Sequence, residues 1–173
     1  MQEFTNEAID IDALPQFQHV ELTAPDPLYW RVILINILIF ALVIGGTIGC
    51  IAFFQKDFRP LSIYFTIAFV LLFGLIFILH KVAFKKRGYA LREKDVVYKS
   101  GVIAEKTSIV PINRIQHVAL KEGMLSRIYK LATLEVHTAG GSSGNLNIAG
   151  IPIDQARAIK DALLRKLDFT DPE

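Results

Sequence analysis

Residues 32–54, VILINILIFALVIGGTIGCIAFF, form one long apolar run, and residues 61–79, LSIYFTIAFVLLFGLIFIL, form a second. As α-helices, these runs of 23 and 19 residues would extend roughly 28–34 Å, which matches a hydrocarbon core of about 30 Å. They contain 15 and 14 Leu, Ile, Val or Phe residues, so each is expected to insert favourably into a bilayer. The sequence therefore predicts two membrane-spanning helices and excludes a purely cytosolic protein.

The connection between the two runs is only six residues long, residues 55–60. The helices are therefore expected to form an antiparallel hairpin, with both ends of the chain on one side of the membrane. That side carries five basic residues next to the runs: Arg31, Lys81, Lys85, Lys86 and Arg87. The connection itself carries two, Lys56 and Arg59. The positive-inside rule then predicts that both termini are cytoplasmic.

The charges divide the chain into three parts, although the total over 173 residues is only +2. Residues 1–30 carry a net charge of −6, residues 31–80 carry +2, and residues 81–173 carry +6. We therefore expect an acidic cytoplasmic N-terminal arm, a transmembrane hairpin and a basic cytoplasmic domain. The arm could be a flexible tether, add a strand to the domain or lie across its basic surface. Cys50 is the single cysteine, which excludes an intramolecular disulfide.

The domain after the hairpin has the pattern of a small β-rich fold. Segments rich in β-branched residues alternate with turn signals, and they predict strands at residues 89–92, 96–99, 102–112, 115–121, 131–138 and 145–151. A short helical or irregular connection is expected between residues 121 and 130. The chain then ends in a predicted helix over residues 153–167, with Asp154 as its N-cap and one apolar stripe of Ala156, Ile159, Leu163 and Leu167. These elements predict a small barrel or sandwich closed by the C-terminal helix.

Several pieces of this domain carry a resemblance to a known family. They are Gly101–Val102, PINRIQHV at residues 111–118, Ser126–Arg127 and LATLEVHTAG at residues 131–140. Together with the two preceding spans, they resemble the bacterial membrane-flanked PH-like family, specifically its YdbS-like members, over about residues 25–170. One departure is Lys130, because many relatives have a glycine before the Leu-Ala pair. This departure concerns the local turn rather than the fold.

The resemblance implies an α+β membrane protein in which two orthogonal antiparallel sheets are capped by the C-terminal helix. It also implies a non-catalytic role at the bacterial inner membrane. Relatives often occur beside a larger membrane protein with several PH-like domains, so a hetero-oligomeric partner is expected, with a homo-oligomer as the other possibility. The first functional hypothesis is an adaptor that assembles with other membrane proteins. The alternative is a module that binds anionic membrane lipid at the surface.

The candidate site residues are polar side chains in two places. Five follow the second span and could contact anionic lipid heads or simply stop membrane transfer: Lys81, Lys85, Lys86, Arg87 and Arg92. Three belong to the matched motifs and are candidates for partner binding or for a structural role: Arg114, Gln116 and Arg127. The two arginines could bind an anionic group, or form internal salt bridges with Glu122 or Glu135.

Within the first span, Gly45 and Gly49 are candidates for close helix packing. Two small residues four positions apart let another helix approach closely. That helix could be the second span of the same chain, or a helix of a partner or a second copy.

The sequence contains no recognisable catalytic set, so neither an enzyme activity nor a cofactor is expected. His117 and His137 fall on different predicted strands and could meet, but no third ligand accompanies them, and no metal site is expected. The glycine-rich residues 140–144 lack the Lys-Ser/Thr of a phosphate-binding loop and indicate a hairpin tip. The spans contain no Asp, Glu, Lys or Arg, which argues against an ion pump. Basic residues cluster at the membrane end without interleaved aromatics, so nucleic acid is not an expected partner.

Overall fold

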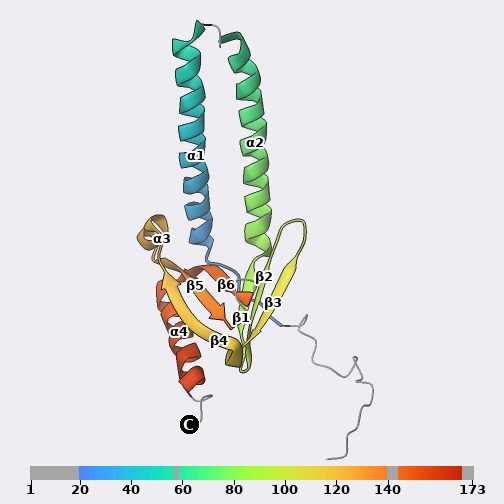
Figure 1. Ribbon diagram of the computed structural model, residues 1–173, viewed down its shortest axis with the longest axis vertical. Coiled ribbons are helices and arrows are strands. Elements are labelled where there is room, and N and C mark those ends of the chain that lie inside the picture. The colour runs from blue at the N-terminus through green and yellow to red at the C-terminus, as the bar shows by residue number, and fades with distance from the viewer. Residues whose placement is uncertain (1–19, 57–58, 140–143, 169–173) are drawn as a thin grey trace, which may run out of the picture.

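The computed structural model describes residues 20–56, 59–139 and 144–168. A hairpin of two long helices stands on a domain of two small sheets and a C-terminal helix (Figure 1). In chain order the elements are α1 (Pro27–Phe54), α2 (Arg59–Lys86), β1 (Gly88–Leu91), β2 (Asp95–Ser100), β3 (Lys106–Pro111), the 3-10 turn η3 (Ile112–Arg114), β4 (Ile115–Lys121), α3 (Met124–Ile128), β5 (Leu131–Thr138), β6 (Leu146–Pro152) and α4 (Ile153–Asp168).

Helices α1 and α2 contain the two predicted spans and extend beyond both of them. Helix α1 begins at Pro27 because the Asp26 carboxylate caps it, accepting a hydrogen bond of 2.7 Å from the Leu28 amide. Proline suits this first position, where its missing N–H is not needed. Helix α2 continues to Lys86, so the basic residues after the predicted span lie on its last turns. Both helices are long and apolar enough to cross a membrane, and their most apolar windows are not buried within the chain.

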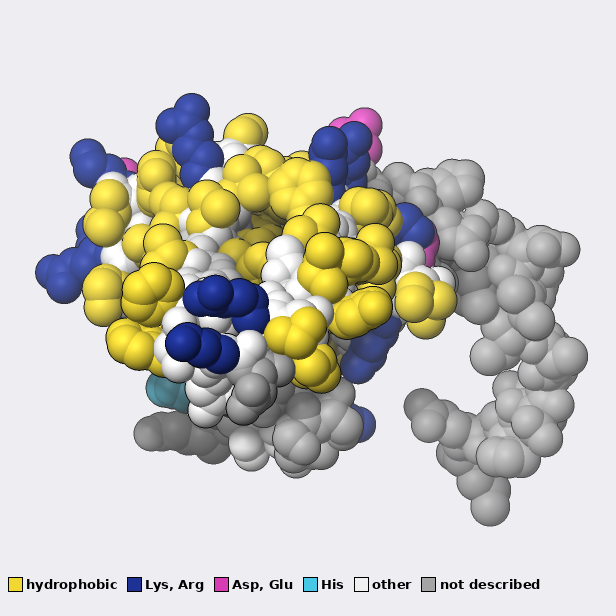
Figure 2. All heavy atoms as spheres, turned by 90° about the horizontal axis from the view of Figure 1, so that it is seen from above, with side chains coloured by type: hydrophobic (Ala, Val, Ile, Leu, Met, Phe, Trp, Pro, Cys, Tyr) yellow, Lys and Arg dark blue, Asp and Glu magenta, His cyan; other side chains and the backbone are white. Residues whose placement is uncertain are grey.

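Aromatic contacts hold the two helices together at the end of the hairpin nearest the domain. The Trp30 ring centroid lies 5.7 Å from that of Phe77 and 5.7 Å from that of Phe84. The Tyr29 ring lies 6.5 Å from Phe84. Seen down the hairpin, apolar side chains face the viewer over the helices, and Lys and Arg side chains lie mainly around the rim (Figure 2).

The domain consists of two three-stranded antiparallel sheets, in the orders β1-β2-β3 and β4-β5-β6. Val97 lies opposite Ile109 in the first sheet, and Leu134 lies opposite Ile148 in the second. The predicted strands over residues 115–121 and 131–138 coincide with β4 and β5. In the part of the chain that the structure describes, the sheets do not close into a barrel, so the α+β PH-like fold takes its open, two-sheet form.

The predicted strand over residues 102–112 is wrong at its start. Strand β3 covers only Lys106–Pro111, and a bend occupies residues 102–104. Gly101 has a φ of 125°, and a Cβ at this position would collide with the Ala104 carbonyl oxygen. Because only glycine adopts this conformation readily, the chain turns sharply here despite the β-branched residues that follow.

The conformation of the turn before β5 accounts for the glycine that many relatives have in place of Lys130. Lys130 has a φ of 53°, in the left-handed region where glycine has no Cβ to clash. Its carbonyl oxygen accepts a hydrogen bond of 2.9 Å from the Ile153 amide, at the first residue of α4. Since α4 begins at Ile153, Asp154 lies within the first turn, and the predicted N-cap at Asp154 is wrong.

The hydrophobic core lies between the two sheets and α4. Its largest fully buried side chains come from β2, β5, β6 and α4, with Leu134, Ile148, Ile151 and Leu163 at 0–1% exposure. The predicted apolar stripe of α4 is confirmed. Ala156 and Leu163 are fully buried, and Ile159 and Leu167 pack against the same cluster.

The segment before α1 joins the domain, which resolves part of the open question about the acidic arm. Thr23 and Tyr89 exchange two backbone hydrogen bonds of 2.8 and 3.0 Å, so Thr23 forms an isolated bridge to β1. The Asp26 amide donates to the Gly150 carbonyl of β6 at 2.8 Å. Of the alternatives for the arm, addition to a sheet is therefore observed at Thr23. Residues 1–19 lie outside the described residues.

Candidate functional site

The predicted basic cluster after the second span does not form a single patch, because Lys86 is held within the chain. Its ammonium group lies 3.1 Å from Glu105 Oε1 and donates to the Val102 carbonyl at 3.2 Å. Lys99 approaches the other oxygen of Glu105 at 2.8 Å. Glu105 thus fastens the β2–β3 hairpin to the end of α2, and Figure 1 shows this hairpin rising beside the helix.

The ion pairs that Glu105 forms with Lys86 and Lys99 should depend on pH. Hydrogen bonds and positive charge from Lys99 and Lys86 hold the pKa of Glu105 below its usual value of 4.5. The stabilisation from these ion pairs is therefore fully present above pH 4.5 and is lost as the pH falls through the lower pKa of Glu105 in the folded state. With Cys50 replaced by serine and spin labels at Lys85 and Ile103, we expect one narrow distance distribution at neutral pH that broadens below pH 4.5.

Two substitutions complete this pH experiment. Glu105→Gln should broaden the distance distribution at neutral pH and remove most of its pH dependence. Glu122→Gln, in the exposed connection before α3, should leave both unchanged. If the distance distributions of the wild-type chain and Glu105→Gln are identical at every pH, Glu105 does not hold the β2–β3 hairpin against α2.

Arg92 is also engaged within the domain. Its Nε and Nη2 donate to the two carboxylate oxygens of Asp95, both at 2.6 Å, across the turn between β1 and β2. This bidentate pair raises the pKa of Arg92. Lys81 and Lys85 are exposed and form no ion pair or hydrogen bond with a described residue through their side chains. The lipid-contact interpretation therefore does not extend to the five residues as a group.

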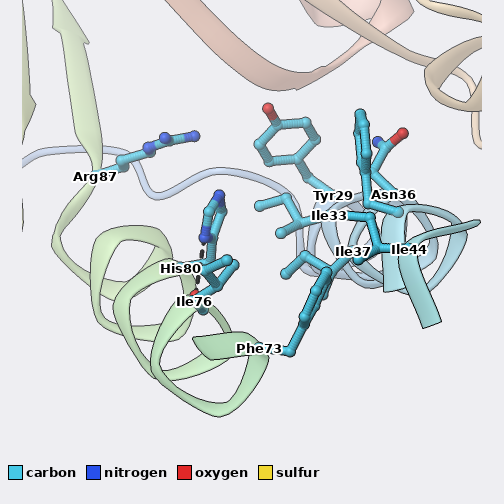
Figure 3. Close-up of a pocket in the computed structure, with 10 residues that line it drawn as sticks. Tyr29, Ile33, Asn36, Ile37, Ile44, Phe73, Ile76, His80 and Arg87 are labelled. Carbon is cyan, nitrogen blue, oxygen red and sulfur yellow. Dashed lines mark hydrogen bonds between the residues drawn. The ribbon is translucent and has the colours of Figure 1, made fainter. Parts of the chain in front are cut away.

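Arg87, the remaining member of the cluster, lines a groove between α1 and α2 at the domain end of the hairpin. The groove has a volume of about 450 Å³ and is lined by Tyr29, Ile33, Asn36, Ile37, Phe40, Ile44, Phe73, Ile76, His80 and Arg87. Figure 3 shows the Arg87 guanidinium, the His80 ring and the Tyr29 hydroxyl toward one end of the groove, with aliphatic and Phe73 side chains beyond them. The groove therefore combines one polar end with walls that are apolar except for Asn36, whose side-chain amide donates to the Val32 carbonyl at 3.0 Å.

The electrostatics place Arg87 next to the first sheet. Burial raises the pKa of Tyr98 in β2, and the positive charge of Arg87 opposes that rise. No described residue forms an ion pair or hydrogen bond with the Arg87 side chain. His80 is positioned by its Nδ1, which lies 2.9 Å from the Ile76 carbonyl oxygen one turn earlier.

The motif residues Arg114 and Arg127 lie apart, at opposite ends of β4. Arg114 ends η3, and its side chain lines a second groove, of about 300 Å³, with Ile109, Val110, Pro111, Thr138 and Gly144. Arg127 is exposed on the short helix α3. The alternative of internal salt bridges is wrong for the described residues. Glu135 instead has Lys121 at 3.8 Å and His137 at 3.9 Å, and Glu122 is paired with neither arginine.

Gln116 is exposed where the register of β4 against β5 shifts, between Ile115 and His117. His117 lies directly opposite His137, with ring centroids 5.7 Å apart, so the two histidines do meet. Within the described ranges, no group of three His, Cys, Asp or Glu side chains could hold a metal ion.

The structure separates the two glycines of the first span. A Cβ at Gly45 would lie 3.3 Å from Phe69 Cζ, so Gly45 faces α2 of the same chain. A Cβ at Gly49 would meet no atom within 4 Å. Gly45 therefore serves the contact within the hairpin, whereas no atom of the described residues would be in contact with a side chain at Gly49.

Sequence reasoning missed the groove between the helices and the roles of Tyr29 and His80. The spacing of Ile33, Ile37, Phe40 and Ile44 does mark one face of α1, but the partner residues on α2 and the return of Arg87 toward that face depend on how the helices pack.

Comparison with known proteins agrees with this architecture. A family model described as Bacterial PH domain matches residues 32–167. The UPF0699 transmembrane protein YdbS of Bacillus subtilis (strain 168) is 31% identical over 98 residues, which cover 57% of this chain and 60% of that protein. The UPF0699 transmembrane protein YdbT of the same organism is 26% identical over 86 residues, which cover 49% of this chain and 17% of that protein.

The matched region spans less than two thirds of either relative. No solved structure matches the chain. The extent of the family match, the two membrane-capable helices and the two-sheet domain with its C-terminal helix agree with one another. The chain therefore belongs to the Bacterial PH domain family and is a membrane-anchored PH-like protein similar to YdbS.

Proposed function

We propose that this protein is a non-catalytic adaptor of the bacterial inner membrane, whose PH-like domain captures an extended segment of another membrane protein on the cytoplasmic side. The hairpin provides the anchor, and the domain provides the binding surface. The observation that carries the proposal is the outer edge of β3, together with the groove beside it.

Strand β3 is an edge strand, because among the described strands it pairs only with β2. An edge strand presents unpaired backbone N–H and C=O groups and can accept an added strand from another chain. The groove lined by Ile109, Pro111 and Arg114 lies beside the C-terminal half of β3. Ile109 is 40% exposed, so an added segment can place an apolar side chain against it.

Arg114 gives this edge its chemical preference. Its guanidinium makes no ion pair or hydrogen bond with a described residue. Arginine binds carboxylates through two parallel hydrogen bonds, so the partner segment should carry an acidic side chain near the residue that enters the groove. A larger membrane protein with several PH-like domains is the partner class that we propose. The match to YdbT over only 17% of its length supports the occurrence of related sequence in a longer membrane protein.

The structure also bears on surface lipid binding, on the side of the membrane that holds the termini, and on assembly through the helices. Lys86 is paired with Glu105, and Arg92 is paired with Asp95. Of the five residues proposed to bind lipid, this leaves Lys81, Lys85 and Arg87. Exposed Lys81 and Lys85 near the domain support cytoplasmic termini through the positive-inside rule. Assembly through the exposed faces of the helices remains compatible with capture by β3.

The adaptor proposal is tested by purifying the tagged full chain from its native membranes in mild detergent and identifying bound proteins by native mass spectrometry. A stoichiometric membrane-protein partner is expected. Arg114→Glu should reduce the recovered partner about tenfold or more, because a charge-assisted hydrogen bond contributes about 1.5–3 kcal/mol and the new charge repels an acidic segment.

The matched control is Arg127→Glu, which makes the same change on exposed α3. It should leave the recovered partner unchanged. Equal recovery with Arg114→Glu and the wild-type chain would exclude the β3 edge as the capture site. Recovery of the wild-type chain without any protein partner would contradict the adaptor function itself.

A further inference from the structure

We infer that the groove between α1 and α2 holds one anionic phospholipid, with its phosphate at Arg87 and an acyl chain between the helices. This site is separate from the proposed adaptor surface at β3. It would make the hairpin a specific lipid receptor as well as an anchor. The inference rests on the shape of the groove, the chemistry of its polar end and its position on the hairpin.

The apolar part of the groove has the form that an acyl chain requires. Isoleucine and phenylalanine side chains of α1 and α2 line its walls: Ile33, Ile37, Phe40, Ile44, Phe73 and Ile76. The approach of Phe69 to Gly45 brings the helices together just past Ile44 and closes this end. From Tyr29 to Ile44 the groove follows α1 for about 22 Å, at about 1.5 Å per residue. This length suits one leaflet, from the headgroup level to the region of the bilayer centre.

The polar end has the chemistry of a phosphate site. Arg87 directly follows α2, and its guanidinium has no acidic partner among the described residues. Among the residues that line the groove there is no Asp or Glu, so nothing there would neutralise Arg87 or attract a cationic headgroup. Arginine binds phosphate oxygens through paired N–H donors. An anionic lipid is therefore favoured over a zwitterionic one.

His80 refines the choice of headgroup. A carbonyl oxygen only accepts hydrogen bonds, so the contact of Nδ1 with the Ile76 carbonyl at 2.9 Å requires the proton on Nδ1. In the neutral ring, Nε2 is then an acceptor, and Figure 3 shows this nitrogen directed away from Ile76 toward the polar end. An acceptor next to a phosphate-binding arginine suits a headgroup hydroxyl. Phosphatidylglycerol, with one phosphate and two free hydroxyls, meets both requirements.

The experiment uses the full chain, stripped of native lipid and incubated in detergent with equimolar phosphatidylglycerol and phosphatidylethanolamine. Native mass spectrometry then counts the retained lipids. We expect one phosphatidylglycerol per chain, retained in preference to phosphatidylethanolamine. Arg87→Gln should lower its occupancy about tenfold or more, because the charged hydrogen bonds to phosphate are lost.

Two further variants distinguish a specific lipid-binding site from non-specific electrostatic attraction of anionic lipid. Lys85→Gln removes the same charge from an exposed neighbour that has no partner among the described residues, and should leave occupancy unchanged. Ile37→Trp fills the apolar part of the groove without changing charge, and should also reduce lipid retention. Arg114→Glu should have no effect on the lipid, so failure at this site and failure of the adaptor proposal are distinguishable.

Several results would overturn the inference. Equal loss with Lys85→Gln and Arg87→Gln would show diffuse electrostatic attraction instead of a site. Equal retention of the two lipids would contradict the role of Arg87. Competition by millimolar inorganic phosphate, with Ile37→Trp unchanged, would show an anion site without an acyl chain. A dimer that forms without lipid and is lost on Ile37→Trp would assign the groove to a second copy of the chain.

Discussion

Leu163→Ala should destabilise the domain by about 2–5 kcal/mol, the range for a leucine truncated in a closely packed core. Leu163 is completely buried in α4, where it packs against the core shared by both sheets. Removing its side chain leaves a cavity between α4 and the sheets, and the neighbouring strands cannot close it without losing their pairing. The expected result is a fall in the melting temperature of at least about 8 °C for a domain of this size.

The measurement for Leu163→Ala is thermal unfolding of the full chain in detergent, followed by near-ultraviolet circular dichroism of the domain. Leu164→Ala provides a matched control, since it removes the same atoms from the adjacent position, which is 38% exposed. The control should shift the melting temperature by far less. Equal shifts for both variants would show that α4 does not cover the core in the way described.

Gly150→Ala should loosen the junction between the hairpin and the domain. Gly150 has a φ of 83°, and a Cβ there would lie 2.6 Å from Tyr29 Cγ. The left-handed conformation alone costs a non-glycine residue about 1–2 kcal/mol, and the contact with a rigid ring adds to this cost. Because the Gly150 carbonyl accepts from the Asp26 amide at 2.8 Å, movement of β6 should also release the start of α1.

Hydrogen exchange of residues 20–29 tests this junction directly. In Gly150→Ala the Asp26 amide should lose most of its protection, and the melting temperature of the domain should fall. Gly49→Ala is the control, because a Cβ at Gly49 meets no atom within 4 Å. Unchanged protection at Asp26 in Gly150→Ala would mean that the contact between Tyr29 and β6 does not fix the hairpin.

These junction contacts bear on both proposals. Thr23 is bridged to β1, Asp26 is bonded to β6, and Glu105 is paired with Lys86 at the end of α2. They connect the hairpin to both sheets of the domain. An adaptor held in this way would present the β3 edge in a defined orientation to the membrane. The same contacts keep Arg87 beside the groove between the helices.

The features that depend on local pattern could be predicted from the order of the residues. Two apolar runs with a six-residue connection gave the hairpin, because a helix must bury an apolar stretch of this length in lipid or in a large core. Segments rich in β-branched residues between turn signals predicted β4 and β5 with the correct bounds, and a repeat of three to four residues predicted the buried face of α4. The motifs also indicated the family, which the match over residues 32–167 confirms.

Which charged side chains are available for binding depends on how the helices and sheets pack. Lys86, Arg92 and Arg87 look alike in the sequence, yet the first meets Glu105, the second meets Asp95 and the third lines the groove. Helix packing likewise placed Gly45 against Phe69, whereas an added Cβ at Gly49 would meet no described atom within 4 Å. Periodicity reports which face of an element is buried, but the partner of a long side chain depends on distances between elements. Those distances are set only when the hairpin and both sheets pack together.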